Sequence, residues 1–202
     1  AEVHSVVLDV RDRAKVNEVI VQLPDAWKKI DVLVNNAGLA LGLDNFQDGN
    51  EDDWEVMNDT NIKGLLVMGR AVAPLMVANS GGHIINIGSI AGKEVYPKGD
   101  VYSATKHAVD AITKGMRIDL LKSGVRVTQV APGAVETEFS KVQFKGDEDR
   151  AKMVYQNYTP LSAKDIAEVV YFAASRPAHV NINDVVVMPF DQANAITFNK
   201  KS

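Results

Sequence analysis

The sequence predicts an α/β protein with a doubly wound, Rossmann-like parallel sheet. Short apolar runs alternate with longer amphipathic segments along the whole chain, which is the pattern of repeated βαβ units. Each apolar run ends at a polar or turn-forming residue, and ligands of parallel sheets bind at those carboxyl ends. The 202 residues contain no internal repeat and no linker, so one domain is expected over residues 1–202.

The composition excludes several classes of protein. Hydrophobic residues make up 46% and charged residues 24% of the chain, which is typical of a globular protein and excludes disordered and low-complexity chains. The sequence has no cysteine, so disulfide scaffolds, thiolate nucleophiles and cysteine-ligated metals are excluded. A net charge of −4 argues against a nucleic-acid partner.

Signals for membranes, secretion and metals are also missing from the sequence. No uninterrupted apolar run approaches the roughly 20 residues that span a bilayer, and Ala1–His4 lack the features of a signal peptide. We therefore expect no membrane partner and a cytoplasmic location. No metal site is expected, because the four histidines share no ligand spacing: His4, His83, His107 and His179.

The first predicted elements are a strand and a helix. Ser5–Leu8 is apolar enough for a buried strand, which would end at Asp9. Asp12 is a candidate N-cap for the helix that follows. The apolar stripe of that helix repeats at helical spacing and consists of Val16, Val19, Ile20 and Leu23.

A second strand and a long helix come next. Asp31–Val34 is predicted to be a strand that runs into the turn Asn35–Gly38. Small residues in this turn let a flat ligand approach the backbone, and asparagine side chains can tie neighbouring strands together. Asp52–Ala78 is expected to be helical with a kink near Asn61, because asparagine is a poor interior helix residue. A plain surface asparagine is the alternative.

The alternation then continues to the C-terminus. The further strands expected are His83–Ile87, Val125–Val130 and Asp184–Met188. The further helices expected are Ser162–Ala174 and Asp100–Lys122, the latter ended by Gly124.

The segment between Ala134 and Pro160 has few apolar repeats, so a long irregular connection is expected there. Such connections are either lids over a substrate or plain surface loops, and the sequence leaves both open. Within it, Phe139–Gly146 alternates apolar and polar residues. As a lid, this stretch would lay Phe139 and Phe144 over the cleft.

Tyr102 and Lys106 form the central candidate pair. At positions i and i+4 of a predicted helix they share one face. A lysine ammonium near a tyrosine hydroxyl lowers the pKa of the phenol, which can then exchange a proton with a substrate hydroxyl. Ser89 follows a predicted strand and can hydrogen-bond the substrate oxygen. The alternatives are an exposed tyrosine, a solvated lysine and an ordinary turn serine.

These residues, in this order, resemble the short-chain dehydrogenase/reductase family. The resemblance covers nearly the whole chain and rests on Asp9, the Asn35–Gly38 turn, Asn61, Ser89, the Tyr102–Lys106 pair, Pro132-Gly133 and Thr137. The finer pattern is similar to the NADP-dependent 3-hydroxy acid (serine-type) dehydrogenases. It rests on Asn35–Leu41, Phe139–Gly146, Pro177–Asn183 and Val187-Met188-Pro189.

The resemblance implies a role for each catalytic position. Tyr102 would be the general acid/base, and Lys106 would lower the pKa of Tyr102 and bind the nicotinamide ribose. Ser89 would orient and polarise the substrate oxygen. Asn61 would hold a water in a proton relay to Lys106.

The resemblance also implies a nicotinamide cofactor, and NADP is favoured over NAD on the subgroup pattern alone. Asp9 would contact the adenine ring. Asn35 and Gly38 would line the cofactor cleft, and Val135 and Thr137 would hold the carboxamide. Hydride chemistry belongs to the cofactor, while the protein positions and polarises the substrate.

One element of the family pattern is absent from this chain. No glycine-rich turn follows a first strand, so the first βαβα segment and its pyrophosphate-binding helix end are not in the sequence. The strand Ser5–Leu8 would then lack a neighbour, and the edge of Asp31–Val34 would be open. Either upstream residues of the natural protein are not in this sequence, which we favour, or the chain is a truncated product.

The predicted function is oxidation of the C3 hydroxyl of 3-hydroxy acids such as serine or 3-hydroxypropionate analogues, or the reverse carbonyl reduction. The alternative is a truncated, catalytically silent family member that acts as a binding or assembly module. An epimerase of the extended relatives is a third interpretation, but few residues follow Pro132 to form a substrate domain.

Two expectations concern binding. The expected helices carry apolar residues beyond one stripe, including the run Leu65–Met68, so at least a dimer and, by family resemblance, a homotetramer is expected. A hydroxy acid carries a carboxylate, which a cation holds best. The candidate cations are Lys93, Lys98, Lys141 and Lys145, each with a solvated surface lysine as the alternative.

Overall fold

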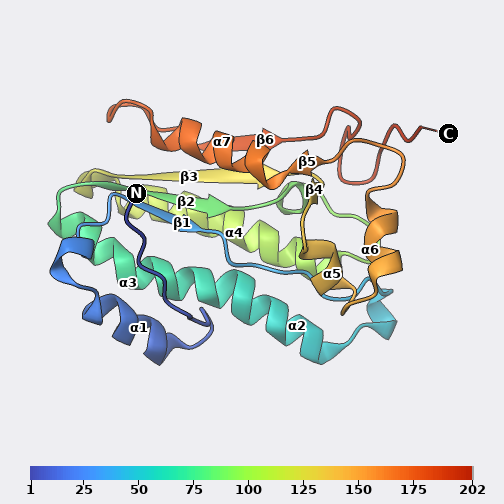
Figure 1. Ribbon diagram of the computed structural model, residues 1–202, viewed down its shortest axis with the longest axis horizontal. Coiled ribbons are helices and arrows are strands. Elements are labelled where there is room, and N and C mark those ends of the chain that lie inside the picture. Colours follow the sequence, from blue (N-terminus) through green and yellow to red (C-terminus); the bar gives the residue numbers. More distant parts are fainter. Residues whose placement is uncertain (202) are drawn as a thin grey trace.

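A four-stranded parallel sheet forms the centre of the protein. The structure is a computed structural model and describes residues 1–201. The strands are ordered β1-β2-β3-β6 across the sheet, and each pair of neighbours is parallel (Figure 1). Their bounds are β1 Val32–Asn35, β2 Gly82–Ile87, β3 Val125–Pro132 and β6 Asp184–Val187. The predicted α/β class with a parallel sheet is confirmed.

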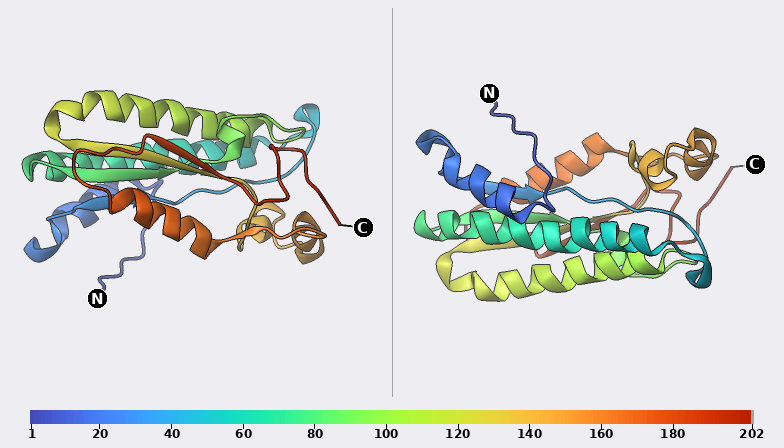
Figure 2. Two further views of the ribbon diagram at one scale, coloured as in Figure 1. Left: turned by 90° about the horizontal axis from the view of Figure 1, so that it is seen from above. Right: turned by 90° about the horizontal axis from the view of Figure 1, so that it is seen from below.

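Helices cover both faces of this sheet, as a parallel sheet requires. Helices α3 and α4 lie on one face and α7 on the other, while α1 packs against α3 (Figure 2). The helix bounds are α1 Arg13–Gln22, α2 Glu51–Asn58, α3 Leu65–Ala78, α4 Asp100–Asp119 and α7 Ala163–Ala174. Single 3₁₀ turns occupy Asp25–Trp27, Phe46–Asp48, Ile90–Gly92 and Leu121–Ser123.

Two apolar cores follow from the alternation of side chains along β2. Ile84 packs on one face of the sheet with residues of α3, and Ile85 packs on the other with residues of α7. Both isoleucines are completely buried. Successive strand residues point to opposite faces, so an unbroken apolar run is what a doubly covered strand needs.

Asp12 caps α1 as expected, accepting from the backbone N–H of Lys15 at 2.9 Å.

The long helix predicted over Asp52–Ala78 is present but interrupted. Between α2 and α3, the π-helical turn Asp59–Gly64 contains Asn61, where the kink was expected. The run Glu51–Ala78 is long and apolar enough to match a membrane span by composition. In the structure it packs against α1, α4 and the sheet.

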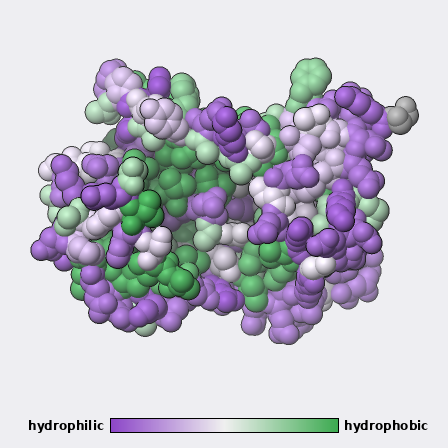
Figure 3. Space-filling model, viewed as in Figure 1, coloured by the Kyte–Doolittle hydropathy of each residue, from purple (hydrophilic) through white to green (hydrophobic). Residues whose placement is uncertain are grey.

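The strand predicted at Ser5–Leu8 is wrong. These residues form no strand, and Val7 is fully exposed. A strand needs a hydrogen-bonded neighbour, and no strand lies beside this segment among residues 1–201. β1 is consequently an edge strand with Val32 and Val34 exposed. Figure 3 shows apolar side chains gathered in a hollow on the face that carries this edge.

The connection from Ala134 to Pro160 is more regular than expected. It begins with β4 (Val135–Glu136), which pairs in parallel with β5 (Leu161–Ser162), the strand directly after the connection. Two short helices lie between them, α5 (Phe139–Gln143) and α6 (Glu148–Val154). The alternating pattern at Phe139–Gly146 therefore belongs mostly to a helix, because local hydrogen bonding to Glu138 and Ser140 carbonyls closes helical turns.

A buried histidine in β2 makes stability depend on pH. The Thr128 hydroxyl donates to the Ile182 carbonyl at 2.6 Å, so it accepts from Nε2 of His83 at 2.7 Å. Burial, with a smaller effect of the Arg126 charge, lowers the pKa of His83 to about 4. Below pH 6.5, the pKa of the unfolded state, His83 becomes protonated in the unfolded chain but stays neutral in the folded chain until about pH 4.

We therefore expect the free energy of unfolding to fall by about 2 kcal/mol between pH 6.5 and pH 4.5 through this residue alone. In His83→Gln, which keeps a donor toward Thr128, this decrease in the free energy of unfolding should disappear. Urea unfolding at both pH values measures it, with the exposed His4→Gln as control. Parallel pH profiles for wild type and His83→Gln would contradict the assignment.

Candidate active site

Ser89, Tyr102 and Lys106 meet at the carboxyl end of β2. Ser89 follows that strand and caps the 3₁₀ turn Ile90–Gly92, accepting from the backbone N–H of Ala91 at 3.1 Å. Tyr102 and Lys106 lie one turn apart on α4, and the Nζ of Lys106 is 5.9 Å from the centre of the Tyr102 ring. The sheet register and the helix together produce the cluster that the sequence predicted.

The electrostatics of the pair differ from the sequence expectation. Burial raises the pKa of Tyr102 to about 12, and a hydrogen bond with Ser89 opposes the rise. Burial lowers the pKa of Lys106 to about 8, and its Nζ donates to the Ile87 carbonyl at 3.0 Å. The Tyr102 pKa is therefore raised here rather than lowered, because desolvation outweighs the hydrogen bond with Ser89. The phenol holds its proton at neutral pH.

Asn61 uses its side chain to clamp the loop after β1. Its Oδ1 accepts from the Leu39 N–H at 2.9 Å, and its Nδ2 donates to the Leu39 carbonyl at 2.8 Å and to the Thr105 hydroxyl at 3.1 Å. Asn61 is buried, so the alternative of a surface asparagine is wrong. The π-helical turn and the clamp both explain why asparagine occupies this position.

Gly38 lies directly against this cluster. A Cβ at Gly38 would lie 3.2 Å from Oδ1 of Asn61 and 3.5 Å from Nζ of Lys106. Glycine therefore leaves a bare backbone surface beside the lysine. A flat ring can approach such a surface, as the sequence predicted for this turn of small residues.

Asn35 ties two strands and a helix together. Its Nδ2 donates to Oδ1 of Asn86 at 2.8 Å, and Nδ2 of Asn86 donates to the Thr113 hydroxyl at 2.9 Å. All three side chains are buried. Asn86 and Thr113 were not among the residues predicted from the sequence. The visible signal for Asn86 was a single amide within the apolar run His83–Ile87.

The remaining predicted cofactor residues make contacts of their own. Asp9 is paired with Arg11 at 2.7 Å, and that hydrogen bonding lowers the pKa of Asp9 to about 2. The Thr137 hydroxyl accepts from the Phe139 N–H at 3.2 Å. The Val135 carbonyl accepts from the Tyr155 hydroxyl at 2.8 Å. None of these contacts joins Asp9, Val135 or Thr137 to Tyr102.

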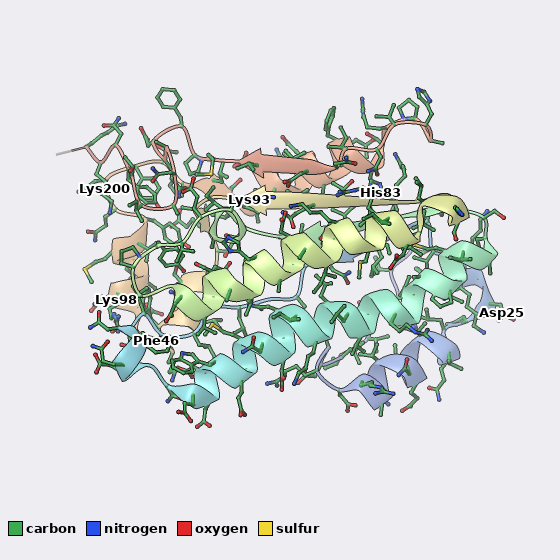
Figure 4. The ribbon with its side chains drawn as sticks, turned by 180° about the vertical axis from the view of Figure 1, so that it is seen from behind. Asp25, Phe46, His83, Lys93, Lys98 and Lys200 are labelled. Atoms are coloured by element: carbon green, nitrogen blue, oxygen red, sulfur yellow. The ribbon has the colours of Figure 1, made fainter. Side chains whose placement is uncertain are left out.

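A pocket beside Tyr102 lies between the loop after β1, the start of α2 and the segment before α4. Trp54, Phe46 and Met57 give it apolar walls. Its charged lining comprises Asp44, Asp53, Lys98 and Asp100. Figure 4 shows Phe46 and Lys98 at the same end of the molecule. Across residues 1–201, no group of three His, Cys, Asp or Glu side chains could hold a metal ion.

Helix α5 is held over this pocket by hydrogen bonds to the loop after β1. Gly42 and Gln143 exchange two hydrogen bonds, Gly42 N to Gln143 O at 3.0 Å and Gln143 Nε2 to Gly42 O at 3.2 Å. The Phe139 ring meets the Tyr102 ring edge-on with centres 5.8 Å apart. These contacts favour the lid over the plain surface loop. Phe144 was expected over the cleft, but it packs against the Arg150 guanidinium instead.

The four candidate lysines differ in their ion-pair partners. Lys93 pairs with Asp110 and Asp184, Lys141 with Glu148 at 3.8 Å, and Lys145 with Asp53 at 2.8 Å. Within the described part of the chain, Lys98 makes no such ion pair and lines the pocket. Lys98 and Lys145 both adopt a left-handed backbone conformation, with φ of +66° and +53°, so the ion pairing and not the backbone separates them.

Comparison with known proteins gives consistent relatives. Residues 1–148 match the short chain dehydrogenase family. The NADP-dependent 3-hydroxy acid dehydrogenase YdfG of Salmonella typhi is 53% identical over 93% of this chain and 76% of its own length. Sulfoacetaldehyde reductase 2 of Chromohalobacter salexigens is 48% identical over 95% of this chain and 76% of its own length.

Solved structures agree with the sequence relatives. The closed form of a serine dehydrogenase complexed with NADP+ superposes with a TM-score of 0.92 at 48% identity, over 96% of this chain and 79% of that one. Serine dehydrogenase from Escherichia coli superposes with a TM-score of 0.80 at 44% identity, over 92% and 76% of the two chains. The chain therefore belongs to the short-chain dehydrogenase family of oxidoreductases.

Proposed function

We propose that the protein is an NADP-dependent oxidoreductase that interconverts 3-hydroxy acids and their 3-oxo forms. Serine-like and 3-hydroxypropionate-like acids are the proposed substrates. The observation that carries the proposal is the cluster of partly buried Ser89 and Tyr102 with buried Lys106, beside a pocket with both charged and apolar walls. The relatives named as 3-hydroxy acid and serine dehydrogenases support this choice of substrate.

The residues present fit the nicotinamide half of the cofactor. The bare backbone of Gly38 beside Lys106 leaves room for a flat ring and a ribose hydroxyl. We propose that Asn35, Gly38, Val135 and Thr137 line this half and that Asp9 meets the adenine. The cofactor supplies or accepts the hydride, and the chain's own residues handle the proton.

The proton chemistry follows from burial. With a pKa near 12, Tyr102 carries its proton at neutral pH and can donate it to a carbonyl oxygen during reduction. Ser89 polarises the same oxygen. In the direction of oxidation, Tyr102 must first be deprotonated, and the Lys106 ammonium stabilises the phenolate. The Asn61 side chain is occupied by Leu39, so a relay through Asn61 would use its backbone carbonyl.

A catalytically silent binding or assembly module remains the second candidate function. NADP-dependent turnover of a 3-hydroxy acid by the purified protein distinguishes the two functions.

The first prediction concerns the general acid. Tyr102→Phe keeps the ring and removes the proton carrier, so turnover should fall by about 10²–10⁴-fold while the unfolding midpoint changes little. Steady-state rates with NADP and a 3-hydroxy acid measure it. Tyr171→Phe, exposed on α7, is the control. A Tyr102→Phe rate above about a tenth of wild type would refute the assignment.

The second prediction concerns the substrate carboxylate. Lys98 is the pocket cation without an ion-pair partner in the described chain, so we propose that it binds this group. Lys98→Met should raise KM for 3-hydroxy acids about tenfold and leave KM for neutral alcohols unchanged. Asp44 and Asp100 in the same lining suit the ammonium of a serine-like substrate.

The double variant Lys141→Met/Lys145→Met is the matched control for Lys98. These lysines bind Glu148 and Asp53, so their loss should loosen the lid and affect charged and neutral substrates equally. If the double variant discriminates between charged and neutral substrates and Lys98→Met does not, the carboxylate is bound by the lid.

The third prediction concerns assembly, for which we propose a cytoplasmic homotetramer. Large apolar side chains are exposed on α3 and after α4, among them Leu66, Val77 and Leu121, and on α7, where Tyr171 is 73% exposed. Faces of this kind are normally covered in an oligomer. Light scattering at micromolar concentration should give four times the chain mass, and a monomeric mass would contradict the proposal.

A further inference from the structure

Hydrogen bonds and ion pairs form a closed ring that joins the turn at residues 89–93, here called the Ser89 turn, to α4, the helix that carries Tyr102 and Lys106. We propose that Lys93 and Asp110 are positioning residues that set the distance between Ser89 and Tyr102. The role in turnover rests on the oxidoreductase function proposed above, whereas the ring itself is a property of the fold. Neither residue touches the reacting atoms.

Lys93 is the last residue of a rigid turn that begins at Ser89. The Gly92 N–H donates to the Ser89 carbonyl at 2.9 Å, and the Lys93 N–H donates to the Ile90 carbonyl at 2.9 Å. The Ser89 hydroxyl closes the same turn by accepting from Ala91. Because every residue of the turn is hydrogen-bonded, fixing Lys93 also fixes Ser89.

Asp110 lies on the same stripe of α4 as the catalytic pair. It follows Lys106 by one turn and Tyr102 by two, and residues at this spacing share a helix face. The Nζ of Lys93 lies 2.5 Å from Oδ1 of Asp110 and also binds Asp184 of β6. Figure 4 shows Lys93 between α4 and the upper strands of the sheet.

Close packing completes the ring beneath the ion pair. A Cβ at Gly92 would lie 2.6 Å from the Lys106 carbonyl oxygen, so the turn rests directly on the α4 backbone. A Cβ at Gly88 would lie 2.9 Å from Cδ of Gln129. Gln129 of β3 is buried and donates to Oδ1 of Asp110 at 3.0 Å. Ser89 is therefore held from its C-terminal side by Lys93, while Gln129 packs against the preceding residue, Gly88.

The ion pair between Lys93 and Asp110 is more buried than most other ion pairs in the described chain. The side chains of Lys93 and Asp110 are 22% and 16% exposed, whereas most other pairs in the described chain involve side chains that are more than 40% exposed. A partly buried pair within a hydrogen-bonded network holds its geometry better than an exposed one. Displacing a reacting group by about 1 Å can reduce a rate by about 10²-fold.

Lys114 provides a matched control on the same carboxylate. It binds Oδ2 of Asp110 at 2.5 Å from the solvent side, where it is 61% exposed. It lies on α4 itself, so its bond does not connect the Ser89 turn to the helix. Lys93→Met and Lys114→Met each remove one positive charge from Asp110, but only the first opens the ring.

The test measures kinetics and hydrogen exchange on the complete protein. Lys93→Met should lower kcat by about 10–100-fold with KM within about threefold for charged and neutral substrates alike. Lys93→Arg should recover most of the rate, and Lys114→Met should stay near wild type. Amide exchange in residues 89–94 should accelerate in Lys93→Met and remain unchanged in Lys114→Met. If Lys93→Met does not fold, Lys93→Gln, which keeps one donor, replaces it.

Three results would overturn the proposal. The first is an equal loss of kcat in both lysine variants, which would indicate a charge effect. The second is a KM increase confined to carboxylate substrates, which would make Lys93 a substrate ligand. The third is unchanged exchange in residues 89–94. If the wild-type protein has no dehydrogenase activity, the proposed function fails, and the exchange comparison alone decides whether the ring holds the Ser89 turn.

Discussion

The structure depends on the burial of β2 and β3 on both faces. A strand that is covered twice buries nearly every side chain, so its residues are apolar or, like His83 and Asn86, hydrogen-bonded, and helices must pack on each side of it. The connections between parallel strands then return over the sheet, so every strand ends at the same edge. Ser89 follows β2 at that edge, and α4, which covers one face, brings Tyr102 and Lys106 beside it. The site is a geometric consequence of the core.

The same burial sets the chemistry of the site. Removing Tyr102 and Lys106 from water disfavours the charged form of each, so their pKa values move in opposite directions, to about 12 and about 8. The site is therefore prepared to donate a proton, as carbonyl reduction requires. A charged ligand group or a bound oxyanion nearby changes these pKa values more strongly than it would in water, because the local dielectric is low.

Polar networks keep the buried parts in register. Asn35, Asn86 and Thr113 link β1, β2 and α4 without any net charge. Lys93, Asp110 and Asp184 link the Ser89 turn, α4 and β6 through ion pairs. Unsatisfied polar groups inside a protein are costly, so the hydrogen bonds and ion pairs of these networks favour this one arrangement. Apolar packing alone would fix the layers but not the sub-ångström spacing between side chains that catalysis needs.

The amino-acid pattern predicted the parallel sheet, most of its strands and helices, and the one-turn spacing of Tyr102 and Lys106, because periodicity and short-range spacing are properties of neighbouring residues. Asp12 caps its own helix, and Tyr102 and Lys106 lie one helical turn apart, so local spacing suffices to find them. The partners of Asn61 lie 22 and 44 residues away and are not visible locally. The strand predicted at Ser5–Leu8 was wrong, since an apolar run forms a strand only beside a hydrogen-bonded neighbour.

The pKa directions, the partners of the candidate lysines and the ring through Asp110 depend on how distant segments pack. Lys93 and Asp184 are 91 residues apart in the chain, and Gln143 and Gly42 are 101 residues apart. Desolvation and contacts across such distances arise from packing. They cannot be read from a window of sequence.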